Sequence, residues 1–142
     1  MAGRGSRTLV AIKHIVDTHT LLWYLAGSAQ LGNAARVILQ DTASELFIPA
    51  ITLAEACWIV ERGRVALTVL DVLTAIDSDP RMTILPLDRT IIERSNILTA
   101  VGEMHDRQIV ATALVLQDQG ETVDLLTKDG NITASGLVAI VW

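Results

Sequence analysis

Four acidic residues of this 142-residue chain stand where the sequence predicts the end of a strand or the start of a helix. Asp17 and Asp129 each follow a short apolar segment directly, while Glu55 and Asp106 fall in the first turns of predicted helices. In a parallel α/β sheet, strand ends and the helix starts that follow them share one edge, where ligands bind. The spacing therefore predicts one acidic pocket. Asp106 belongs to it on the assumption that its helix begins on the side where the next strand ends.

Such a pocket has a chemical consequence. Two carboxylates about 4 Å apart, at an effective dielectric constant of about 20, repel by about 4 kcal/mol. Several such pairs would be large against a total stability of about 5–15 kcal/mol, so the pocket must be partly protonated or hold cations. Oxygen ligands without a cysteine or histidine cluster favour Mg²⁺ or Mn²⁺ over zinc. These ions activate water and neutralise charge on a phosphodiester, which favours metal-dependent hydrolysis.

Each acid also has a purely structural interpretation. Asp17 and Asp106 could be helix N-caps, and Asp129 begins an Asp-Gly turn pair. Thr52 and Glu55 match a capping box, which would accept Gln in place of Glu, whereas a metal ligand needs the carboxylate charge. Taken singly, the capping box and the turn are the better interpretations of those two acids. Only the coincidence of four acids at one edge favours the metal pocket.

The apolar segments predict strands that alternate with helices. Strands are expected at residues 12–16, 46–48, 82–85, 123–126 and 137–141. Helices are expected at residues 20–27, 34–41, 52–62, 65–77 and 88–100, and from residue 106 or 107 to 117. This alternation predicts a three-layer α/β/α fold with a central, mostly parallel sheet of about five short strands. We expect residues 12–142 to form one domain, preceded by a flexible basic tail over residues 1–11.

The composition bears on a possible partner surface, on the redox compartment and on membrane insertion. The chain is 51% hydrophobic with a mean hydropathy of +0.44, which hints at surface buried against a partner. Cys57 is the single cysteine, so a disulfide within the chain and a cysteine-rich zinc site are excluded, and a reducing cytoplasm is expected. No uncharged apolar run approaches the ~18 residues of a membrane span.

The net charge of −5 bears on nucleic-acid binding. A basic balance is the usual sign of a nucleic-acid-binding domain, so any RNA contact here must use local cations or metal. Arg62, Arg64, Arg107 and Lys128 are the candidates for phosphate contact.

Segments 15–23, 51–55, 106–113 and 126–129 resemble, in this order, the PIN-domain nucleases, and more narrowly the VapC-like ribonuclease toxins of type II toxin–antitoxin pairs. The resemblance covers about residues 12–142. It implies a three-layer α/β/α fold and metal-dependent cleavage of RNA. It also implies a cognate antitoxin whose tail enters the acidic groove, and a homodimer.

The resemblance assigns roles to individual residues. The family's acidic quartet corresponds to Asp17, Glu55, Asp106 and Asp129. For these four residues the resemblance implies both catalysis and the binding of Mg²⁺ or Mn²⁺. Thr127 looks like the family's supporting hydroxyl. Many relatives place a further acid shortly before the third one, and Glu103 stands there. The resemblance leaves open whether Glu103 or Asp129 completes the metal shell.

Other residues and functions have competing interpretations. His19 and His105 flank two of the acids, but ordinary polar roles are favoured for them. Trp23 and Tyr24 could stack RNA bases and Trp58 could line the acidic groove, but packing is favoured for Trp23 and Trp58. A non-catalytic binding module, in which the acids are only caps and turns, is one alternative function. An aspartyl-phosphate phosphatase is disfavoured because His19 stands where a second acid is required. A receiver-like domain matches only loosely, through Lys128.

Overall fold

The computed structural model describes residues 11–142, so the predicted tail lies outside the described residues except for Ala11. Within that range the strands are β1 (Ile12–Val16), β2 (Glu45–Pro49), β3 (Met82–Leu85), β4 (Thr122–Leu126) and β5 (Ala139–Val141). They form one sheet in the order β3-β2-β1-β4-β5, and every pairing is parallel. The predicted α/β class and the five-stranded sheet are confirmed.

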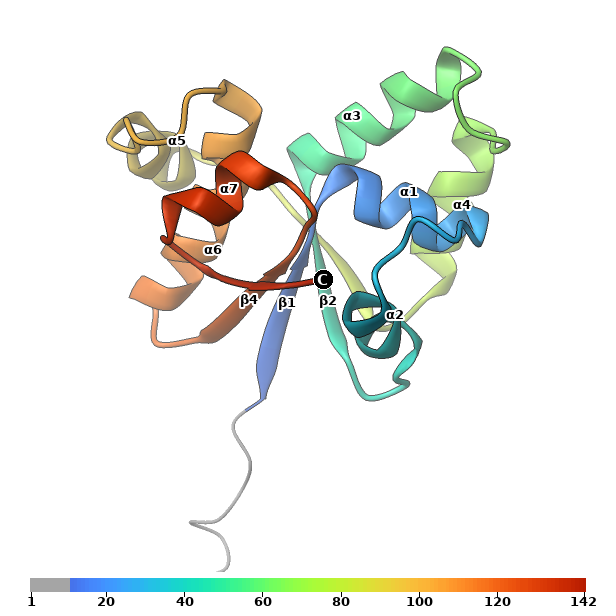
Figure 1. Cartoon of the computed structure of the whole chain (residues 1–142), viewed down its shortest axis with the longest axis horizontal. Coiled ribbons are helices and arrows are strands. Elements are labelled where there is room, and N and C mark those ends of the chain that lie inside the picture. The colour runs from blue at the N-terminus through green and yellow to red at the C-terminus, as the bar shows by residue number, and fades with distance from the viewer. Residues whose placement is uncertain (1–10) are drawn as a thin grey trace, which may run out of the picture.

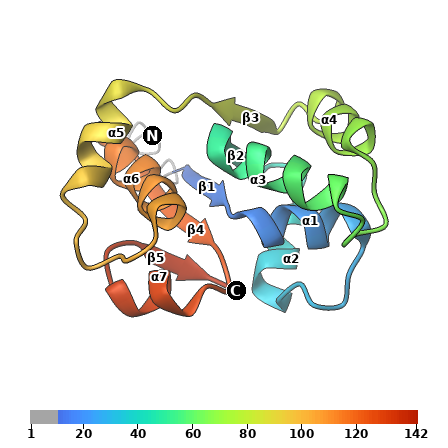
Figure 2. The ribbon, with the colours of Figure 1, turned by 90° about the horizontal axis from the view of Figure 1, so that it is seen from above.

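Helices cover both faces of this sheet (Figures 1 and 2). They are α1 (Thr18–Ala26), α2 (Asn33–Gln40), α3 (Ala50–Glu61), α4 (Val69–Ser78), α5 (Arg89–Asn96), α6 (Met104–Asp118) and α7 (Gly130–Ser135). The first four lie on one side, and α5, α6 and α7 lie on the other. The three-layer arrangement predicted from the alternation of elements is therefore present.

Alternating side chains of the central strands divide the core into two clusters. Val16 and Leu126 point towards the first four helices, while Ile15 and Leu125 point towards the other three. Successive strand residues face opposite sides of a sheet, so a strand buried on both faces must be apolar throughout. This explains why the fully buried ends of the two central strands, residues 15–16 and 125–126, are apolar on both faces.

The largest differences from the predicted boundaries fall at helix ends, where capping decides. α4 begins only at Val69, because Thr68 caps it and forms a capping box with Asp71. α6 begins at Met104, two or three residues before the predicted start at Asp106 or Arg107, because Glu103 caps it. α7 was not predicted, since its six residues are too short to show a helical period.

The carboxyl edge of the sheet positions the candidate site. Val16 and Leu126 are register partners in β1 and β4, so the residues after them leave the sheet side by side. The backbone N–H of Asp17 donates to the carbonyl of Leu126 at 3.2 Å, and the Thr20 hydroxyl donates to the same carbonyl at 2.7 Å. α1 packs against α3, and α3 against α6, which brings the starts of these helices to that edge. None of the helices in residues 11–142 is long and apolar enough to cross a membrane.

Candidate active site

Asp17 is fixed at the end of β1 by two donors. It caps α1, and its Oδ1 accepts a hydrogen bond from the backbone N–H of Thr18 at 2.7 Å. Its Oδ2 accepts from the hydroxyl of Thr127, at 2.5 Å. Thr127 is only 1% exposed and follows β4 directly, so the neighbouring strand holds the carboxylate in place. The capping interpretation of Asp17 is confirmed, and it is compatible with a further role.

Glu55 has no capping role. α3 begins at Ala50, with Pro49 at the cap position, so Thr52 lies inside the helix and the predicted capping box is wrong. Proline favours this start because its fixed φ suits a helix entry and its missing N–H is not needed there. The Thr52 hydroxyl is buried without a hydrogen-bond partner among the described residues. The Glu55 carboxylate is therefore free to point away from its own helix.

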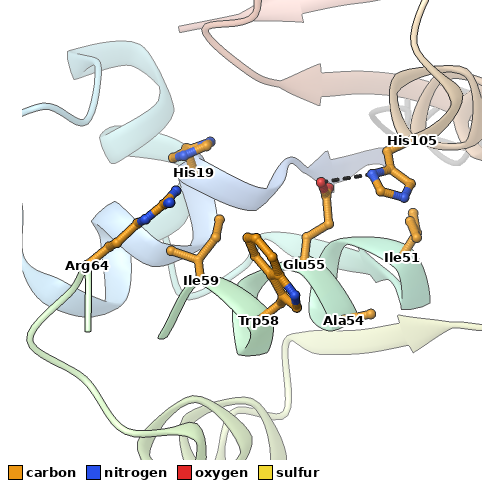
Figure 3. A pocket seen from close by; sticks show the side chains of 8 residues that line it. All are labelled: His19, Ile51, Ala54, Glu55, Trp58, Ile59, Arg64 and His105. Atoms are coloured by element: carbon orange, nitrogen blue, oxygen red, sulfur yellow. Dashed lines mark hydrogen bonds and ion pairs between the residues drawn. The ribbon is translucent and has the colours of Figure 1, made fainter. Parts of the chain in front are cut away.

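Two residues from other helices hold the Glu55 carboxylate. The Thr18 hydroxyl donates to Oε1 at 2.9 Å, and His105 Nδ1 lies 3.1 Å from Oε2 (Figure 3). An ordinary polar role was predicted for His105, and Thr18 was not among the predicted site residues. One signal was available for Thr18: a hydroxyl beside a strand-end acid, in the first turn of a helix, can face whatever that acid faces.

The capping role expected for Asp106 belongs to Glu103. Glu103, not Asp106, is the N-cap of α6, and its Oε2 accepts from the backbone N–H of Asp106 at 3.0 Å. The interpretation of Asp106 as an N-cap is therefore wrong. Glu103 Oε1 also lies 3.6 Å from Nδ1 of His105, the residue that contacts Glu55.

Asp129 is both a cap and a neighbour of Asp17. Its Oδ1 accepts from the backbone N–H of Ile132 at 2.9 Å and so caps α7. Its own N–H donates to the Thr127 hydroxyl at 3.0 Å, and that hydroxyl in turn donates to Asp17. The turn interpretation is correct in part, because the Asp-Gly pair starts a short helix.

Five acidic residues are joined in this way by consecutive contacts at the sheet edge, Asp17, Glu55 and Glu103 through their carboxylates and Asp106 and Asp129 through their backbone N–H groups. The order of contacts is Asp129, Thr127, Asp17, Thr18, Glu55, His105, Glu103 and Asp106. We call this set the acidic network. The structure thus brings together every acid that the sequence nominated, and it adds Thr18 and His105 as the groups that link them.

The carboxylates of the acidic network repel one another. The pKa of Asp106 is raised to about 7, first by burial and then by the charges of Asp129, Glu103, Asp17 and Glu55. Burial also raises the pKa of Asp17, against the opposing hydrogen bonds from Thr127 and Thr18, and the charges of Asp129 and Glu55 raise it further. The electrostatic strain expected from clustered acids is therefore present in this fold.

Two hollows flank the acidic network. The larger, of about 420 Å³, lies beside Glu55 and is lined by His19, Ile51, Ala54, Glu55, Trp58, Ile59, Arg64 and His105 (Figure 3). The smaller, of about 280 Å³, is lined by Asp17, His19, Thr20, Trp23, Lys128 and Asp129. His19 lines both, so the two hollows meet at the start of α1.

The aromatic residues at these hollows differ in burial. Trp23 is partly buried, with its ring centroid 5.5 Å from that of His19 and 5.7 Å from that of Trp142, so its predicted packing role is confirmed. Trp58 is 49% exposed, so the packing interpretation of this residue is wrong. Among the cations, Lys128 lies over the Trp23 ring, whereas Nε of Arg107 donates to the carbonyl of Val101 and so has a structural partner.

Comparison with known proteins agrees with this geometry. The family model of the PIN domain matches residues 14–134. The chain belongs to the PIN-domain family. No curated protein sequence is detectably similar to this PIN domain.

Solved structures share its fold. A toxin–antitoxin complex from Klebsiella pneumoniae superposes with a TM-score of 0.68 at 21% identity, over 91% of this chain and 96% of that one. VapC20 of Mycobacterium tuberculosis, a toxin that cleaves the sarcin–ricin loop, gives 0.62 at 16% identity, over 88% and 96%. FitAcB of Neisseria gonorrhoeae gives 0.61 at 18%, over 91% and 96%.

The donor set of this PIN domain suits a hydrated divalent ion. Within residues 11–142, no three His, Cys, Asp or Glu side chains converge closely enough to form a ready-made metal cage. Mg²⁺ does not require one, because it is usually held by one or two carboxylates and keeps several of its waters. The acids of the acidic network offer carboxylate oxygens as ligands of this kind. Their mutual repulsion is one that a cation would relieve.

Proposed function

We propose that this PIN domain is a metal-dependent endoribonuclease and the toxin of a toxin–antitoxin pair. The observation that supports the proposal most directly is the acidic network at the carboxyl edge of the sheet. VapC20 is a toxin that cleaves the sarcin–ricin loop, and the Klebsiella structure is a toxin–antitoxin complex, so these structural relatives support the proposed activity and kind of partner. We further propose a protein antitoxin and a homodimer for this chain.

Asp17, Glu55 and Asp106 would hold Mg²⁺ or Mn²⁺ through their carboxylates. Asp129 is the better candidate than Glu103 for the fourth ligand, because Asp129 lines the same hollow as Asp17 and Glu103 does not. When bound, such an ion would activate water and neutralise charge on the phosphodiester.

The other residues of the acidic network have positioning roles in this proposal. Thr127 and the N–H of Thr18 hold the carboxylate of Asp17, while the Thr18 hydroxyl and His105 hold that of Glu55. Each carboxylate can then bind the metal ion without first having to be ordered, which is the usual function of such supporting hydrogen bonds.

A non-catalytic binding module remains the second candidate, because Asp17, Glu103 and Asp129 all cap helices. Caps alone would explain these acids without any chemistry. The two candidates differ in what neutral substitutions do. A cap tolerates Asn in place of Asp, whereas a metal ligand does not.

The test is cleavage of a mixed RNA pool by the purified protein with Mg²⁺ or Mn²⁺, with and without chelator. Asp17→Asn keeps the cap but removes the charge, and Glu55→Gln keeps the shape. Asp88→Asn is the matched control, because Asp88 caps α5 through the N–H of Ile91 at 3.0 Å, outside the acidic network.

We expect metal-dependent cleavage that the two site variants lose and the control retains, with all proteins folded by circular dichroism. Cleavage that survives both site variants, or that chelator does not reduce, would contradict the proposed site. Folded protein that neither cuts RNA nor responds to metal would support the binding module instead.

A further inference from the structure

We infer that the 420 Å³ hollow beside Glu55 binds one unpaired base of the RNA substrate, with the Trp58 indole as its stacking surface. This inference rests on the proposed ribonuclease function and adds a site of base recognition to it. We call this hollow the base pocket.

The Trp58 ring is exposed but held in place. Its side chain is 49% exposed, and the guanidinium carbon of Arg62 lies 3.5 Å from the ring centroid. Nη1 of Arg62 donates to the Trp58 carbonyl at 3.2 Å, which ties the cation to the same helical turn. Arg62 does not line the base pocket, so it covers the indole from outside. A fixed indole with a free surface towards a cavity is the platform on which single-stranded nucleic acids stack their bases.

The walls of the base pocket suit a flat, apolar ring with a polar edge. Ile51, Ala54 and Ile59 of α3 provide apolar surface, and the pair formed by Glu55 and His105 provides polar atoms (Figure 3). A volume of about 420 Å³ lies within the usual range of small-ligand sites, about 300–1,000 Å³. Such a mixture of apolar wall and few polar groups is typical of sites that orient one small planar group.

The cationic Arg64 at the mouth favours an anionic ligand such as a nucleotide over a neutral one. Arg64 reaches over the base pocket towards His19, as Figure 3 shows, and both residues line it. The chain as a whole carries a net charge of −5, so a phosphate backbone needs such local cations to approach. Arg64 lies on the segment between α3 and α4, where it can contact the backbone of a strand whose base enters the cavity.

Position connects the base pocket to the acidic network. Glu55 belongs to both, so a base in this cavity would place the adjoining phosphate near the carboxylates. A base can enter such a pocket only when it is unstacked and unpaired, which is how proteins read single-stranded RNA. The inference therefore predicts preference for single strands and dependence on the base itself, not only on the backbone.

The test measures binding of two fluorescent decamers, one of randomised single-stranded RNA and one of abasic ribose-phosphate. Both are titrated without divalent metal against a protein carrying Asp17→Asn, so that the strands stay intact. Trp58→Ala and Trp58→Phe are added to this background. Ile97→Ala is the matched control, because Ile97 is 66% exposed and lies just after α5, away from the base pocket.

We expect Trp58→Ala to weaken binding of the base-bearing strand by about 5- to 150-fold, the loss of one base–aromatic stack. Affinity for the abasic strand should not change, Trp58→Phe should restore most of the loss, and the Ile97 control should match its parent. Equal weakening for both strands, or no weakening, would overturn the inference. If Trp58→Ala leaves the affinity for the base-bearing strand unchanged, and Trp58→Ala with Asp17 intact still cuts RNA, the inference fails while the proposed function stands. The cavity would then be assigned to a protein segment. No RNA binding or cleavage by the unsubstituted protein would overturn both.

Discussion

Asp106→Asn should stabilise the metal-free protein at neutral and alkaline pH. The raised pKa of about 7, against an ordinary value of 3.8, means that the folded protein holds a proton that the unfolded chain releases. Between these two values the unfolded state is favoured increasingly as the pH rises, and above about 7 the whole penalty is present. Asparagine has the same shape without the charge, so it avoids this penalty.

The magnitude follows from the pKa difference. About three pKa units correspond to about 4 kcal/mol at 1.36 kcal/mol per unit. The Asp106 side chain is partly exposed, so solvent screens much of this repulsion, and we expect a gain of about 1–2 kcal/mol at pH 8. At pH 4.5, where most of the penalty is absent, the variant and the parent should differ by less than about 0.5 kcal/mol.

Urea unfolding in chelator, followed by circular dichroism between pH 4.5 and 8, measures the difference. Asp71→Asn is the matched control, because Asp71 is the third residue of α4 as Asp106 is of α6. Asp71 completes a capping box with Thr68, so its replacement should lower stability by about 0.3–1 kcal/mol. Added Mg²⁺ should stabilise the parent more than Asp106→Asn. Loss of stability in Asp106→Asn at pH 8, or a gain that does not depend on pH, would refute the reasoning.

Three further substitutions test the hydrogen bonds that hold the site carboxylates and the packing of Gly32 against the last residue. Thr127→Val removes the buried hydroxyl that donates to Asp17, so it should lower the free energy of unfolding by about 1–3 kcal/mol in urea titrations, and Thr127→Ser should restore it; equal stability of the Val and Ser forms would contradict this. Thr18→Val removes one of two donors to Glu55 and should reduce metal affinity about 10–100-fold in calorimetry, whereas unchanged affinity would show that the bond is dispensable. Gly32→Ala places a Cβ 2.6 Å from a backbone atom of the last residue and should cost about 1–3 kcal/mol of stability; an unchanged melting temperature would contradict the packing described.

The fold could be predicted from the sequence because short apolar-rich segments alternate with helical patterns. The observed bounds of β1 (Ile12–Val16) at the centre of the sheet and of β3 (Met82–Leu85) at its edge match the predicted ones. Helix ends were less accurate, because side chains rather than periodicity decide them. Glu103 is the N-cap of α6, and Pro49 stands at the cap position of α3. Neither position could be assigned before the neighbouring elements were placed.

The acids of the candidate site could be nominated from sequence, but their supports could not. Asp17 and Asp129 follow strands, and that position alone implies the carboxyl edge. The contact between Thr18 and Glu55 spans 37 residues, and that between His105 and Glu55 spans 50. Such contacts depend on how α1, α3 and α6 pack, which local patterns do not specify. The packing role favoured for Trp58 was wrong for the same reason, since only the tertiary fold shows that this residue lines a cavity.

Calorimetric titration of Mn²⁺ into the purified protein tests the central claim most directly. The claim is that the acidic network binds a divalent cation through Asp17 and Glu55. We predict saturable binding to the unsubstituted protein and to the Asp88→Asn control, and its loss from both Asp17→Asn and Glu55→Gln. Binding that persists in both site variants, or that is absent from the folded unsubstituted protein, would contradict the claim.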